Sequence, residues 1–229
     1  MEFGGRMLNP IINKNTDIFF IPLNPPETSS RLGHYFACNS LFWDSLFYSD
    51  VITEATSEKK HYSIDGSEDY VHKIDDQFAD DIIFRTNKYN YKHLVYSIRD
   101  IVPDIIEGDS KLVEATAEHS KKMLELLQES KPKIALLLHA EARNGFIFKF
   151  LRNNYLLFND IEFNNFRAER EKLGFGPKMG PYGKIVKELD TFFYCIHFPS
   201  KRNNKGGIYI DYWKAFKKFL DEYFEKNKE

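Results

Sequence analysis

Four short apolar runs constrain the fold more than any other feature of this 229-residue chain. They occupy residues 17–23, 93–98, 133–138 and 191–197. Each run is almost continuously apolar, which is typical of strands buried on both faces of a parallel sheet. Helical patterns accompany them over residues 40–49, 110–130, 140–153 and 208–226. Because strands and helices alternate, we predict an α/β fold: a three-layer α/β/α sandwich around a four-stranded, mainly parallel sheet.

Two segments fit this alternation poorly. Residues 54–92 mix charged and aromatic side chains with weak periodicity, and we interpret them as an insertion between the first helix and the second strand. Residues 154–183 form a second irregular segment that ends in a glycine-rich sequence. Either segment could cover an active site or be surface elaboration. No linker or internal repeat divides the chain, so we expect a single domain over residues 1–229.

Charge and cysteine content narrow the possible partners. The formal net charge of −2 gives no global positive field, so any binding to nucleic acid requires a local basic patch. The two cysteines, Cys38 and Cys195, are too few for a four-cysteine zinc or iron–sulfur site. No segment approaches the ~18 apolar residues of a membrane span, and the N-terminal residues lack the apolar core of a signal peptide. We expect a cytoplasmic monomer with no membrane partner.

Polar residues follow each predicted strand. Asn24 follows the first strand among prolines, Arg99 and Asp100 follow the second, and His139 follows the third. A polar, basic loop at residues 199–205 follows the fourth. Ligands of open parallel sheets bind outside the carboxyl ends of the strands. The sequence therefore predicts a site for a phosphate-bearing substrate at this edge.

The same four segments resemble motifs of the uracil-DNA glycosylase superfamily, and most closely its mismatch-specific uracil/thymine branch. "IPLNPPETSSRLGHYF" followed by "NSLFW" resembles the first motif, and "YSIRDIVPDIIEGDSKL" resembles the second strand and the segment after it. "KPKIALLLHAEA" resembles the third strand, and "HFPSKRNN" resembles the closing loop. The likeness covers most of the chain in the expected order, apart from residues 54–92.

This resemblance implies a metal-free, cofactor-free hydrolysis of the bond between a flipped-out base and its sugar in DNA. In the superfamily, the residue at the Asn24 position holds the attacking water, and an aromatic at Tyr35 or Phe36 stacks on the base. The closing loop would hold the DNA backbone, since cations beside phosphates give sequence-independent affinity. Its residues are Ser200, Lys201, Arg202, Asn203 and Asn204.

The chain also departs from the superfamily pattern. Pro22 and Pro26 replace glycines around the asparagine, and His139 replaces a glycine, so it either enters the base pocket or packs in the core. Asp100 stands near the position where uracil-reading relatives carry asparagine. A carboxylate only accepts hydrogen bonds, which favours the exocyclic amine of a cytosine-like base. Asp100 could equally cap a turn or pair with Arg99.

The base is therefore predicted to be uracil-like or a modified cytosine, in DNA repair or in defence against foreign modified DNA. Two other functions fit the same residues. The fold could be a catalytically inactive DNA- or base-binding module, in which Asn24 is a turn residue. Alternatively, it could hydrolyse free nucleosides or nucleotides, in which case the basic loop at residues 201–205 would be a solvated turn without a role in activity.

Overall fold

The computed structural model describes residues 6–53, 59–64, 67–72, 78–152, 155, 179–198 and 208–227. Its main sheet has five strands in the order β4–β1–β5–β7–β6. Their bounds are β1 Ile18–Ile21, β4 Tyr96–Ile98, β5 Ile134–Leu137, β6 Gly180–Gly183 and β7 Phe192–Cys195. Strand β1 is parallel to β4 and β5, and β5 is parallel to β7. The predicted α/β fold with a mostly parallel central sheet is confirmed.

The predicted number of strands was wrong, because the sheet has a fifth strand, β6, which pairs antiparallel with β7. Its sequence, Gly-Pro-Tyr-Gly, has no apolar run and resembles a turn. Glycine and proline are tolerated in this strand because it lies at the edge of the sheet, where one side of the backbone has no ladder partner. The pairing also shifts register between Pro181 and Gly183.

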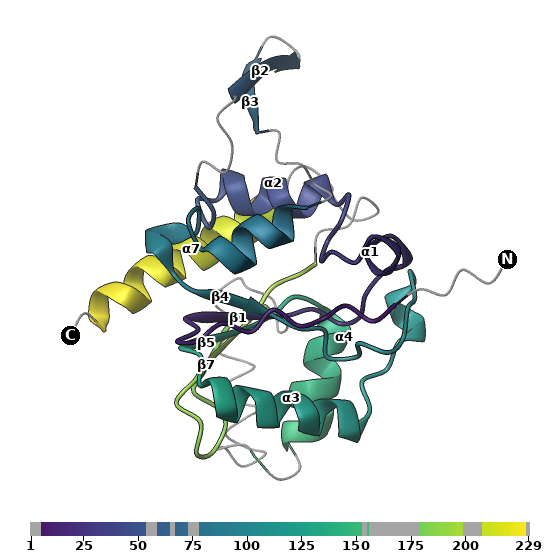
Figure 1. Cartoon of the computed structure of the whole chain (residues 1–229). Coiled ribbons are helices and arrows are strands. Elements are labelled where there is room, and N and C mark those ends of the chain that lie inside the picture. Colours follow the sequence, from purple (N-terminus) through teal and green to yellow (C-terminus); the bar gives the residue numbers. More distant parts are fainter. Residues whose placement is uncertain are drawn as a thin grey trace, which may run out of the picture.

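Each central strand sends alternate side chains into two separate cores. In β1, Ile18 and Phe20 join one apolar cluster, whereas Phe19 and Ile21 join the other, and all four are fully buried. This burial on both faces is the physical reason for the continuous apolar runs. Helices α2 (Ser40–Tyr48) and α7 (Ile208–Lys226) cover the first face, and α3 (Ala117–Ser130) and α4 (Ala140–Arg143) cover the second (Figure 1).

The helices differ from expectation mainly at their ends. Asn39 caps α2, with its side chain accepting from the Phe42 amide. The predicted helix over residues 110–130 is split into a 3-10 turn, η3 (Ser110–Leu112), and α3, whose first turn is closed by a capping box between Thr116 and His119. Helix α4 continues as a π-helix, η4 (Asn144–Leu151).

The predicted insertion contributes to the core at its C-terminal end. It contains the antiparallel hairpin of β2 (Lys59–Ile64) and β3 (Ser67–His72), then the π-helix η1 (Asp81–Thr86) and the 3-10 turn η2 (Tyr91–His93). In Figure 1 the hairpin projects beyond α2. Phe84 of η1 packs edge-on against Phe20 with 5.2 Å between ring centroids.

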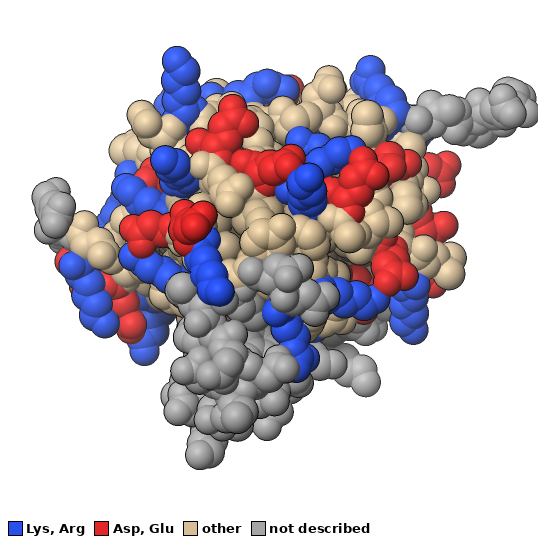
Figure 2. All heavy atoms as spheres, turned by 90° about the horizontal axis from the view of Figure 1, so that it is seen from below, with Lys and Arg blue, Asp and Glu red and all other residues tan. Residues whose placement is uncertain are grey.

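The surface under α3 and α4 carries both signs of charge. Figure 2 shows blue and red side chains interspersed over this face. Several of these charges are ion pairs within α3, such as Lys122 with Glu118 and Lys121 with Glu125. Among the described helices, none combines the length and apolarity required to cross a bilayer.

Candidate functional site at the carboxyl edge of the sheet

The segments that follow β1 and β4 stay side by side beyond the sheet. The amide of Arg99 donates to the Phe20 carbonyl, and the amides of Ile101 and Val102 donate to the carbonyls of Pro22 and Leu23. The two segments therefore continue side by side beyond the ends of β1 and β4. This register brings the Asn24 and Asp100 segments to one edge, as the sequence predicted.

Asn24 is fixed by a loop far away in the sequence. Its Nδ2 lies 3.1 Å from the carbonyl oxygen of Ile105 and 2.9 Å from that of Glu107. Because two carbonyl oxygens face this end of the amide, it must be the NH₂ group. Among the described residues, no donor contacts Oδ1, and Asn24 is partly exposed. The orientation therefore leaves an acceptor oxygen available to a water molecule.

The next short helix explains how the chain leaves this point. Helix α1 (Glu27–Leu32) begins immediately after Pro25 and Pro26, a helix that the sequence analysis did not predict. Pro26 adopts the extended conformation of a helix cap, with φ −70° and ψ 159°. Proline lacks the amide hydrogen that would be unpaired at a helix start, so it suits this position. Asn24 is thus held between a strand end and a proline-initiated helix.

Asp100 and Tyr35 form a buried polar pair near this edge. Their side chains are almost fully buried, and Asp100 Oδ2 and Tyr35 Oη have no hydrogen-bond partner among the described residues. Burial raises the pKa of the Asp100 carboxyl to about 8, against an opposing effect of the Arg99 charge. Burial, followed by the negative charge of Asp100, raises the pKa of the Tyr35 hydroxyl. Both groups therefore hold their protons at neutral pH, and Asp100 is a neutral acid that can donate as well as accept.

Phe36 occupies an aromatic cluster. Its ring centroid lies 3.8 Å from that of Phe42 and 5.6 Å from that of Phe198, and its carbonyl accepts from the Trp43 indole. The backbone at Phe36 has a φ of 54°, in the left-handed region that aromatic residues rarely adopt. Tyr35 and Phe36 are 3% and 5% exposed, so stacking of either ring on a base stays a prediction.

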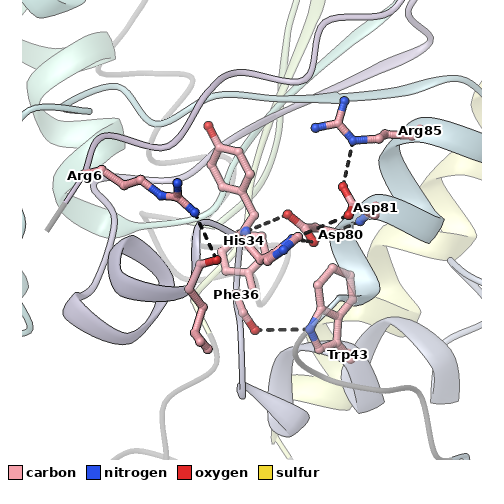
Figure 3. Close-up of polar contacts among 9 residues, drawn as sticks. Arg6, His34, Phe36, Trp43, Asp80, Asp81 and Arg85 are labelled. Atoms are coloured by element: carbon pink, nitrogen blue, oxygen red, sulfur yellow. Dashed lines mark hydrogen bonds and ion pairs between the residues drawn. The ribbon is translucent and has the colours of Figure 1, made fainter.

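A polar clasp holds the loop that carries these aromatics (Figure 3). Asp80 accepts from His34 Nδ1 at 2.9 Å, from the Tyr35 amide at 2.7 Å and from the Asp81 amide at 2.9 Å. Asp81 in turn binds Arg85 at 2.7 Å. Burial raises the pKa of Asp80, and the Tyr35 amide and His34 counter that effect. The clasp ties the end of the insertion to the loop at residues 33–36.

The clasp also contains the one described group of side chains with metal-ligand spacing. The ligand atoms of His34, Asp80 and Asp81 lie within 4.8 Å of one another. However, the oxygens of Asp80 already accept three hydrogen bonds from the protein. The contacts therefore fit a structural role for this cluster, since a metal would have to displace at least one of them.

His139 caps the helix that follows β5. Its Nδ1 accepts from the Glu141 amide at 3.0 Å, which leaves any proton of the neutral ring on Nε2. Burial lowers the pKa of His139, and the neighbouring Arg143 lowers it further, whereas Glu141 opposes the shift. The imidazole is therefore neutral at pH 7. Its role in a base pocket stays a prediction.

Part of the predicted site lies outside the residues that the structure describes. Ser200 to Asn204 lie outside the described residues, so the DNA-binding loop stays a prediction. Phe198, just before that loop, packs with Phe36 and Phe42. Two cavities of the described part of the chain are lined by side chains other than Asn24, Tyr35, Asp100 and His139. One of them lies beside Arg99, a residue expected at this edge of the sheet but not predicted to have a role.

Comparison with known proteins adds no family to these observations. No protein-family model matches the chain, and no curated protein matches it. The likeness to the uracil-DNA glycosylase superfamily therefore depends on the four quoted motifs and on their position at the strand ends.

Proposed function

We propose that this chain is a monofunctional DNA glycosylase, which hydrolyses the N-glycosidic bond of a flipped-out damaged or modified base and leaves an abasic site. The observation that carries this proposal is the fixed orientation of the Asn24 carboxamide at the carboxyl edge of a parallel sheet. Its NH₂ group is held by two loop carbonyls, so its oxygen is available to a water molecule.

The chemistry needs little more than this positioning. The sugar becomes cation-like as the bond to the base breaks, and a water attacks from the opposite side. An amide oxygen is a weak base, so Asn24 would orient the water rather than remove its proton. The rigid attachment of Asn24 to the loop at residues 103–109 supports this role, because a positioning group must itself be held in place.

Asp100 would help to select the base. As a neutral acid it offers one donor and one acceptor side by side. This pair matches the N3 and O4 positions of uracil and also the N3 and N4 positions of cytosine. A protonated Asp100 could therefore pair with a uracil-like base as well as with a modified cytosine, in repair or in defence against foreign modified DNA.

A set of defined duplexes tests the proposal. Each duplex carries one uracil, hypoxanthine, cytosine or 5-hydroxymethylcytosine, and strand cleavage after alkali reports abasic sites. We expect cleavage at one type of base, reduced about a hundredfold by Asn24→Ala because the water loses its orientation. Asn227→Ala is the matched control, since Asn227 is exposed beyond α7. No alkali-labile site in any duplex would argue against an enzyme.

A second candidate is a DNA- or base-binding module without activity. It is favoured by the engagement of Asn24 with the carbonyls of Ile105 and Glu107, which also suits a purely structural asparagine. In that case the protein would bind duplexes without cleaving them, and Asn24→Ala would leave the affinity unchanged.

A further inference from the structure

A cavity of about 230 Å³ lies between the segment that follows β4 and the first turns of α3. Its polar lining consists of Arg99, Asp104, His119 and Lys122, and apolar side chains complete the wall. The lining contains two permanent cations and one carboxylate, so the cavity has a net positive charge.

Arg99 is the unneutralised charge of this cavity. Asp104 binds His119 Nε2 at 2.9 Å, and Lys122 binds Glu118 at 2.7 Å. In contrast, Arg99 is a half-buried residue, and its guanidinium has neither a hydrogen bond nor an ion pair within the described part of the chain. A partly desolvated cation without a partner is unfavourable, and the guanidinium fork matches the oxygens of a phosphate.

The cavity adjoins the segment that holds Asn24. Asp104 lines the cavity, and the next residue, Ile105, supplies a carbonyl that binds the Asn24 amide. The backbone amide of Arg99 also donates to the Phe20 carbonyl at the end of β1. A phosphate in the cavity would therefore lie beside the loop that orients the proposed water-binding oxygen.

We infer that this cavity binds a phosphate group of the DNA strand next to the flipped nucleotide, with Arg99 as its principal ligand. The inference rests on the proposed function for the source of the phosphate. Lys122 strengthens the attraction from the rim, and Asp104 weakens it. Arg99 would thus supply a DNA contact that is independent of the basic loop at residues 201–205.

Fluorescence anisotropy of a labelled duplex with one abasic site tests the inference on the full chain. We expect Arg99→Gln to weaken binding about tenfold, the effect of one charge-assisted contact. The slope of log affinity against log salt should become shallower by about 0.9. Lys122→Gln should reduce the affinity and the salt slope by smaller amounts. Lys121→Gln is the matched control, since Lys121 lies on the same helix outside the cavity and pairs with Glu125.

The outcomes separate the two proposals. If the wild type binds DNA but Arg99→Gln and Lys122→Gln keep its affinity and salt slope, the cavity is not a DNA contact and the glycosylase proposal stands. If the wild type binds no DNA, the proposed function fails. Inorganic phosphate then tests the cavity alone: shifts of the Arg99 and His119 side-chain NMR signals would support a site for small phosphates, and unchanged signals would overturn the inference.

Discussion

Replacement of Asp100 by asparagine should change how stability depends on pH. The pKa of this carboxyl is 3.8 when exposed and about 8 in the folded protein. Between these values the unfolded chain releases the proton and the folded protein keeps it. The contribution of Asp100 to stability is therefore fully present below pH 3.8 and is lost progressively as the pH rises to about 8.

The size of this effect follows from proton linkage. Within that window, each pH unit lowers the free energy of unfolding by about 1.4 kcal/mol. From pH 5 to pH 7, the wild type should lose about 3 kcal/mol relative to Asp100→Asn, which has no titrating group there. For a chain of this size, such a difference corresponds to roughly 6–12 °C in Tm. Asparagine nearly matches the shape of the neutral acid, so packing should change little.

Thermal and urea unfolding of both proteins at half-unit steps from pH 4 to pH 9 provide the measurement. The difference in Tm between Asp100→Asn and the wild type should rise steadily to about pH 8 and then level off. Asp50→Asn is the matched control, because Asp50 is exposed just after the end of α2. Parallel curves for the wild type and Asp100→Asn would show that Asp100 is ionised in the folded protein.

Two further substitutions test the packing around the site. Gly145→Ala should destabilise the protein by about 1–3 kcal/mol in urea unfolding, because the new Cβ would lie 2.8 Å from the Cβ of Ala115. This loss is expected although alanine favours helices. Adding Ala115→Gly should restore most of the lost stability, and independent effects of the two substitutions would contradict this contact. Asp80→Asn should lower the free energy of unfolding by about 1–3 kcal/mol in the same assay, because one amide group cannot accept all the hydrogen bonds from His34 and the Tyr35 amide. An unchanged urea midpoint would show that these hydrogen bonds do not contribute to stability.

The sequence allowed the central strands to be predicted because burial on both faces leaves a continuous apolar run. Phe19 and Phe20 face opposite cores, so neither position tolerates a polar residue. Strand β6 lies at the edge of the sheet, where a continuous apolar run is not required, and its glycines indicated a loop instead. Helix α1 was missed because Pro25 and Pro26 suggest an end of regular structure, although proline is compatible with a helix start.

The site was predictable only in part. The rule for parallel sheets placed Asn24 and Asp100 at one edge from their positions after the strands. It could not indicate that Asn24 binds carbonyls 81 and 83 residues further along the chain, since backbone acceptors leave no signal in the sequence. Likewise, Asp100 is protonated because it is buried, and this burial depends on how residues such as Tyr35 pack in the folded protein.

Mass spectrometry of bases released from diverse genomic DNAs tests the central claim most directly. Each DNA, including phage DNA with modified cytosines, is incubated with the wild type, with Asn24→Ala and without protein. We expect one free base to accumulate only with the wild type, together with an equal number of abasic sites. No free base from any DNA, or an equal yield from Asn24→Ala, would contradict the catalytic role of this edge of the sheet.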